Sequence, residues 1–73
     1  MMTADELKKQ IDHMQKQVDN LTDRMFEMRS ELAKRVYDMD TVDIVAMANR
    51  MNDLEERIVV GEQKVAMAKR ILG

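Results

Sequence analysis

Apolar residues recur along this chain at alternating spacings of four and three, and this spacing constrains the fold more than any other feature. The first series runs without a break from Leu7 to Leu32, and the second runs from Ile44 to Leu72. Such alternation is the heptad pattern of a coiled coil, in which one apolar seam of a helix packs on another helix. The seam residues are Leu7, Ile11, Met14, Val18, Leu21, Met25, Met28 and Leu32, then Ile44, Met47, Met51, Leu54, Ile58, Gly61, Val65, Ala68 and Leu72. We therefore expect an all-α chain.

The two seams differ in register, which favours two helices over one. Continuing the first seam by sevens from Leu32 leads to Met39 and Ala46, whereas the second seam is set by Ile44 and Met51. The heptad phase therefore resets between residues 36 and 44.

A helix start signal precedes each seam. Thr3 followed by Glu6 is a capping box, and Asp40 followed by Asp43 offers an N-cap and an acidic first turn. We predict a first helix over about 4–38, a turn at about 39–40 and a second helix over about 41–72, all within a single unit of 73 residues.

The seams mirror each other about a point between residues 39 and 40, so that Leu7 would face Leu72 and Leu32 would face Met47. This symmetry predicts an antiparallel two-helix coiled-coil hairpin. A continuous or kinked long helix is the alternative, because the turn contains neither Gly nor Pro. In a third arrangement Gly61 ends the second helix and a short third helix follows.

A hairpin of this size has little core, since small chains bury a small share of their surface. Apolar residues outside the seams offer further area to bury, and a helix with more than one apolar stripe usually has more than one neighbour. These residues are Phe26, Ala33, Tyr37, Val42, Val45, Val59, Val60, Met67 and Ile71. We expect them to form a partner or dimer interface, in which two hairpins make a homodimeric four-helix bundle or a different protein binds.

Gly61 interrupts the second seam, and in the mirrored register it faces Val18. Gly inside a helix costs about 1 kcal/mol relative to Ala, and this layer lacks side-chain volume. One interpretation is close helix approach or a tolerated weakness, under which Gly61→Ala should raise stability. The other is a notch that accepts a bulky side chain from a partner.

Charge and composition disfavour several classes of function. Lys and Arg number 12 against 14 Asp and Glu, so the net charge is −2, and neither half of the chain is basic. A nucleic-acid partner is therefore not favoured. No apolar run approaches the roughly 20 residues that span a bilayer. The chain has no cysteine, which agrees with a cytoplasmic location.

The sequence offers little for catalysis or for cofactor binding. His13 is the only histidine, without a second His or Cys nearby to complete a zinc site. We expect no enzyme, no cofactor and no metal. The nine methionines are mostly explained by packing, since five lie on the seams, and flexible Met specifies its neighbours loosely.

The heptads from Leu7 to Leu32 and from Ile44 to Leu72 make this architecture similar to the Rop-like helical hairpins, which dimerise into four-helix bundles, and to the small hairpin co-chaperones of type III secretion. We expect a non-catalytic protein–protein interaction module, such as an adaptor, a small chaperone or an inhibitor, with a larger protein as its partner. The alternatives are a Rop-like nucleic-acid-binding bundle and a structural subunit that folds only within a larger assembly.

Overall fold

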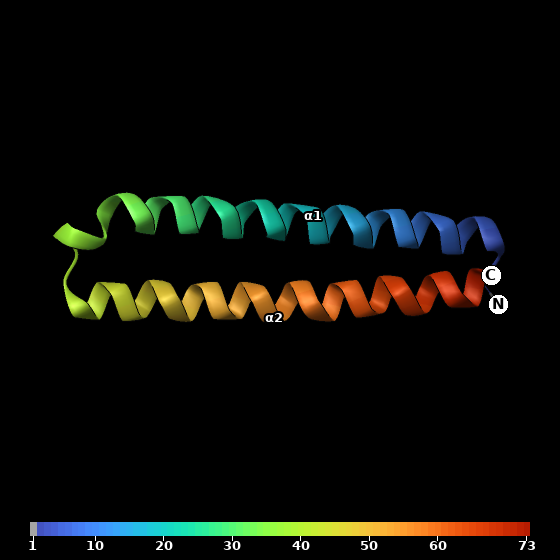
Figure 1. Cartoon of the computed structure of the whole chain (residues 1–73). Coiled ribbons are helices and arrows are strands. Elements are labelled where there is room, and N and C mark those ends of the chain that lie inside the picture. Colours follow the sequence, from blue (N-terminus) through green and yellow to red (C-terminus); the bar gives the residue numbers. More distant parts are fainter. Residues whose placement is uncertain (1) are drawn as a thin grey trace.

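The computed structural model describes residues 2–73 and is a helical hairpin (Figure 1). Helix α1 spans Ala4–Arg35, a single 3₁₀ turn, η1, spans Val36–Asp38, and helix α2 spans Thr41–Leu72. The helices lie antiparallel in a rod of 53 × 15 × 15 Å, with the two chain ends together at one end of it. The predicted antiparallel hairpin is confirmed, and the continuous helix is wrong.

The two helix starts differ in their capping. The Thr3 side chain accepts a hydrogen bond from the Glu6 backbone N–H at 3.2 Å, which satisfies one of the free donors at the start of α1. Asp40 holds the extended N-cap conformation before α2, but its carboxylate makes no capping hydrogen bond. The α2 start therefore has the backbone geometry of a cap without the side-chain bond.

The chain reverses direction without a glycine or a proline. Helix α1 ends at Arg35, short of the expected 38, because Val36–Asp38 tighten into the 3₁₀ turn. Met39 and Asp40 are then extended, and no non-glycine residue among residues 2–73 has a positive φ. Two extended residues after a 3₁₀ turn are enough to bring α2 back along α1.

The seams lie between the helices, as the heptad pattern predicts. Every seam residue is buried or half-buried, and within residues 2–73 only Gln15, Thr22 and Met39 share that status outside the seams. One cluster joins Ile11 of α1 to Val65 and Ala68 of α2. These contacts follow the mirrored register.

Burial along the seams is uneven. All five buried residues, Ile11, Val18, Ile58, Val65 and Ala68, lie in the half of the hairpin nearer the chain ends. We call this the open half, with seam residues Leu7–Val18 and Ile58–Leu72. The seam residues of the turn half, Leu21–Leu32 and Ile44–Leu54, are all half-buried.

Gly61 and Ala68 belong to the well-packed half, although the sequence marks them as the layers with least volume. A Cβ built on Gly61 would lie 2.5 Å from Cγ2 of Val18, and Val18 is only 4% exposed. The small residues allow the helices to approach, and Val18 occupies the space beside the Gly61 backbone. Close approach therefore compensates for the missing side chain in this layer.

Candidate interaction surfaces

The hairpin has two long sides that differ in chemistry. With the seam residues at heptad positions a and d, the e positions of both helices flank one side of the seam and the g positions flank the other. Arg29 and Glu55, both at e, form an ion pair across the helices at 3.1 Å. Arg24 and Arg50, both at g, line one hollow on the opposite side.

The nine residues expected at an interface are all exposed, but the structure does not bring them into one patch. Tyr37, at 98% exposure, and Val42 lie at the turn end. The others divide between the two sides. Phe26, Ala33, Val45 and Val59 lie at b positions, beside the e positions, whereas Val60 and Met67 at c and Ile71 at g lie on the other side.

The first side carries an apolar surface that we call the Phe26 face, made of Phe26, Ala33, Val36, Val45, Ala48 and Val59. All six are exposed, and Phe26 and Val59 each show more than half of their surface. The Arg29 guanidinium carbon lies 6.0 Å from the centre of the Phe26 ring, and the same guanidinium pairs with Glu55. The Arg29 guanidinium therefore lies over the Phe26 ring, while more than half of the Phe26 surface stays exposed.

The second side carries an elongated groove between the helices, which we call the Arg57 groove. The groove consists of three adjoining hollows. The first and the middle hollow are both lined by Gln17, Leu21 and Arg57, and the middle and the last hollow are both lined by Arg24. The two larger hollows have volumes of about 460 and 470 Å³. The apolar floor of the groove comes from seam residues, and its rim carries Arg24, Arg50, Arg57 and Lys64.

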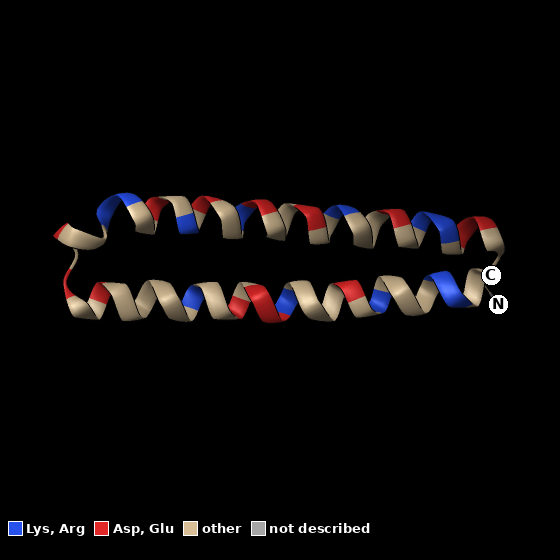
Figure 2. Cartoon of the chain, in the orientation of Figure 1, with Lys and Arg blue, Asp and Glu red and all other residues tan. Residues whose placement is uncertain are grey.

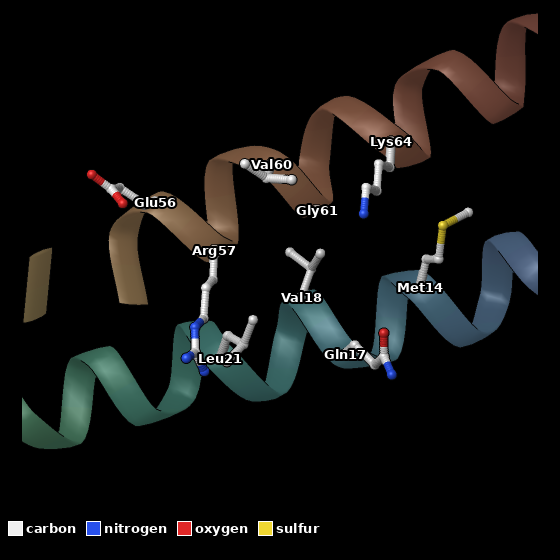
Figure 3. A pocket seen from close by; sticks show the side chains of 9 residues that line it. All are labelled: Met14, Gln17, Val18, Leu21, Glu56, Arg57, Val60, Gly61 and Lys64. Carbon is white, nitrogen blue, oxygen red and sulfur yellow. The ribbon is translucent and has the colours of Figure 1, made fainter. Parts of the chain in front are cut away.

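Gly61 and Val18 lie in the wall of this groove. Figure 3 shows the Val18 side chain pointing toward the Gly61 backbone, with Arg57 and Lys64 projecting from α2 on either side. The space next to the glycine is therefore taken by Val18 of the same chain. The open part of the groove lies beside this layer and is bordered by Val60.

Charged groups of both signs cover both helices, but unevenly (Figure 2). Helix α1 carries seven acidic and seven basic residues, whereas α2 carries five of each, so that charged residues are fewer along α2. The g positions of α2 nevertheless repeat a basic residue at Arg50, Arg57 and Lys64. We did not predict this row from the sequence, because counting charges by halves hides it and only heptad positions reveal it.

The single histidine of the chain lies on α1. His13 is exposed, and its Nε2 lies 3.2 Å from Nε2 of Gln17 on the next turn. No group of three or more His, Asp or Glu residues within residues 2–73 is arranged to hold a metal ion, and neither helix there is apolar enough over its length to cross a membrane.

No family model, curated protein or solved structure matches this chain.

Proposed function

We propose that this protein is a non-catalytic protein–protein interaction module that acts as a homodimeric four-helix bundle, with the Phe26 face as the contact between its two copies. The observation that carries the proposal is the exposed apolar surface of the Phe26 face along a hairpin with so little core. Among residues 2–73 only five residues are buried, and no side chain is fully buried. A chain of this size usually needs a further source of stability, and a second copy supplies it.

The Phe26 face is suited to a two-fold contact. Two of the e positions, one on each helix, hold the small side chains of Thr22 and Ala48, which allow helices to come close. The charged e positions are mixed in sign: Lys8, Arg29 and Lys69 against Glu55 and Glu62. A second copy placed on this side therefore meets no row of like charge.

Dimerisation through the Phe26 face leaves the Arg57 groove free on the outside of the bundle. A free groove is what an adaptor, a small chaperone or an inhibitor uses to bind a larger partner, often as a helix laid in an apolar groove. We place this module in the cytoplasm, in keeping with the lack of cysteine.

The adjacent residues Val59 and Val60 allow a matched test. Their exposed fractions are 51% and 48%, and both line one hollow on α2, but only Val59 belongs to the Phe26 face and only Val60 borders the Arg57 groove. In sedimentation equilibrium, we expect the unaltered protein to be a dimer and Val59→Glu to shift it toward monomer. Val60→Glu should leave it dimeric. Phe26→Glu should act like Val59→Glu.

Three outcomes of this experiment would contradict the proposal. A helical monomer at micromolar concentration would rule out the homodimer. Equal effects of Val59→Glu and Val60→Glu would mean that the Phe26 face is not the contact. An isolated chain that is disordered by circular dichroism would instead favour the structural subunit that folds only within a larger assembly.

A further inference from the structure

We infer that the Arg57 groove binds an amphipathic helix of another protein, one whose apolar stripe is flanked by acidic residues. The inference rests on the proposed function, because it assigns a partner to the side of the hairpin that the second copy leaves free. It goes beyond that function by stating the conformation and the charge of the partner segment.

The groove has the shape and the floor that such a helix requires. The groove runs between α1 and α2 and extends along α2 from Lys64 to Arg50. These two residues are 14 positions apart, which corresponds to about 21 Å of helix at 1.5 Å per residue. That length accommodates about four turns of a partner helix. The floor includes Val18 and Leu21 near one end and Met28, Met47 and Leu54 near the other.

Methionine in the floor makes the groove adaptable. Met14, Met28 and Met47 are half-buried seam residues that also line the groove. Their unbranched thioether side chains change rotamer at low cost and fit apolar side chains of different shape. One groove can thus accept a helix whose apolar residues vary in size.

The rim carries the charge that selects the partner. Arg50, Arg57 and Lys64 stand seven residues apart at g positions, directly beside the floor, and Arg24 faces them from α1. A helix in the groove that repeats Glu or Asp every seven residues would place a carboxylate near each of these cations. This pairing is the same one that sets partner choice at e and g positions of coiled coils.

The acidic residues of the rim argue against a nucleic acid in the same place. Glu27, Asp53 and Glu56 lie at c and f positions, farther from the floor, and Asp53 is 3.3 Å from Arg57. A phosphate backbone carries negative charge along its whole length and would be repelled by them. A partner helix can carry acidic residues next to its apolar stripe and basic residues farther out. Its acidic residues would then face the basic g positions of the rim, and its basic residues would face the acidic c and f positions.

A second copy of this chain fits the groove less well. Two-fold packing of one Arg57 groove on another would bring the Arg50, Arg57 and Lys64 rows of the two α2 helices near each other. Like charges across an interface are unfavourable, whereas the Phe26 face has mixed charge. The Phe26 face is therefore assigned to the second copy of the chain, and the Arg57 groove to the partner helix.

The test uses two synthetic helical peptides of about 21 residues, with Leu at a and d positions and either Glu or Lys at every e and g position. Binding to the full chain is followed by fluorescence anisotropy at low and at physiological salt. We expect the Glu peptide to bind, the Lys peptide to bind at least tenfold more weakly, and the affinity for the Glu peptide to fall as salt rises.

Two double variants with equal change of charge locate the site. Arg57→Gln/Lys64→Gln removes two groove cations, and Lys8→Gln/Lys69→Gln removes two cations at e positions on the other side. Since exposed ion pairs are individually weak, the first variant should reduce affinity for the Glu peptide by about 2- to 30-fold. The second should leave it unchanged.

The inference is overturned if neither peptide binds, if both bind equally, or if the two double variants weaken binding to the same extent. It is also overturned if a mixed-sequence RNA displaces the Glu peptide with strong salt dependence and loses affinity in the Arg57→Gln/Lys64→Gln variant. Sedimentation of the same samples separates the two proposals. A dimer that binds no peptide contradicts only the inference, and a monomer that binds the Glu peptide contradicts only the homodimer.

Discussion

The open half and the turn half of this hairpin use the same heptad pattern and pack differently. The open half holds all five buried residues, and the turn half holds none. The open half places a glycine, an alanine and β-branched residues on its seam, whereas the turn half holds four of the five seam methionines. Small and stiff side chains allow the helices to close around them, while long flexible ones keep the layer open. In this hairpin the difference in burial between the halves therefore follows side-chain shape, since both seams are apolar.

The most direct test of this difference in packing is to truncate the same type of side chain in each half. Ile58 is buried in the open half, and Ile44 is half-buried in the turn half. We expect Ile58→Ala to lower the free energy of unfolding by about 2–5 kcal/mol, because it leaves a cavity among fixed neighbours. Ile44→Ala should cost less than half as much. Urea unfolding at one fixed protein concentration measures both, and equal losses would show that the halves are packed alike.

A substitution at Gly61 should change the free energy of unfolding by a smaller amount, and the sign of that change tests the close packing of this layer. Helix propensity alone predicts that Gly61→Ala stabilises, by about 1 kcal/mol. The new Cβ would meet Val18, a β-branched residue with little freedom to turn away, so we expect a net loss of about 1 kcal/mol.

Val18→Ala alone removes a buried side chain and should also destabilise. Because it makes room for the new Cβ, the double variant should lose less stability than the sum of the two single losses, with a coupling of about 0.5–3 kcal/mol in a double-mutant cycle. Thermal unfolding followed by circular dichroism measures all three variants. A Gly61→Ala variant more stable than the unaltered protein would disprove close packing in this layer.

The two helix starts extend the comparison to the ends of the hairpin. Thr3 makes its capping hydrogen bond, and Asp40 does not. Thr3→Ala should therefore cost about 0.5–2 kcal/mol. Asp40→Ala should cost less, since it loses only the attraction of a carboxylate to the helix N-terminus. The reverse order in urea unfolding would mean that the Asp40 cap forms in solution.

The smallest effect is expected in the turn half itself. Met51→Leu conserves volume at a half-buried position, so its effect on the free energy of unfolding should stay below about 1.5 kcal/mol. A leucine side chain at this position would also specify its neighbours more firmly than the flexible methionine does. Slower backbone amide exchange in the layers of Met25 and Met51 would indicate that the leucine variant packs more firmly. A large loss of stability would instead show that the shape of the methionine side chain is needed at this position.

Much of the fold could be predicted because several features of the heptad spacing independently indicate the same hairpin. The register change between Leu32 and Ile44, the helix start at Thr41 and the mirrored pairing of Val18 with Gly61 all follow from residue positions alone. The 3₁₀ turn after Arg35 could not be predicted, since it depends on how the two packed helices constrain three connecting residues.

The surfaces were harder to predict than the seam. The exposed apolar residues were identified, but their division between the Phe26 face and the Val60 side depends on heptad positions that composition does not report. The row at Arg50, Arg57 and Lys64 was missed for the same reason. Which helix positions flank which side follows from the antiparallel arrangement, which was predicted, but the prediction was not extended to the e and g positions.

The mirrored register also determines the order in which contacts are gained as the chain folds. Leu32 and Met47 are joined by a short connection, whereas Ile11 and Ala68 are joined by most of the chain. Closing the longer loop costs only about 1 kcal/mol more in entropy. The layers that form first, at the turn, are the loosely packed ones, and the layers that release most free energy close last. The turn alone is therefore too weak to persist, and the hairpin should fold and unfold in one cooperative step.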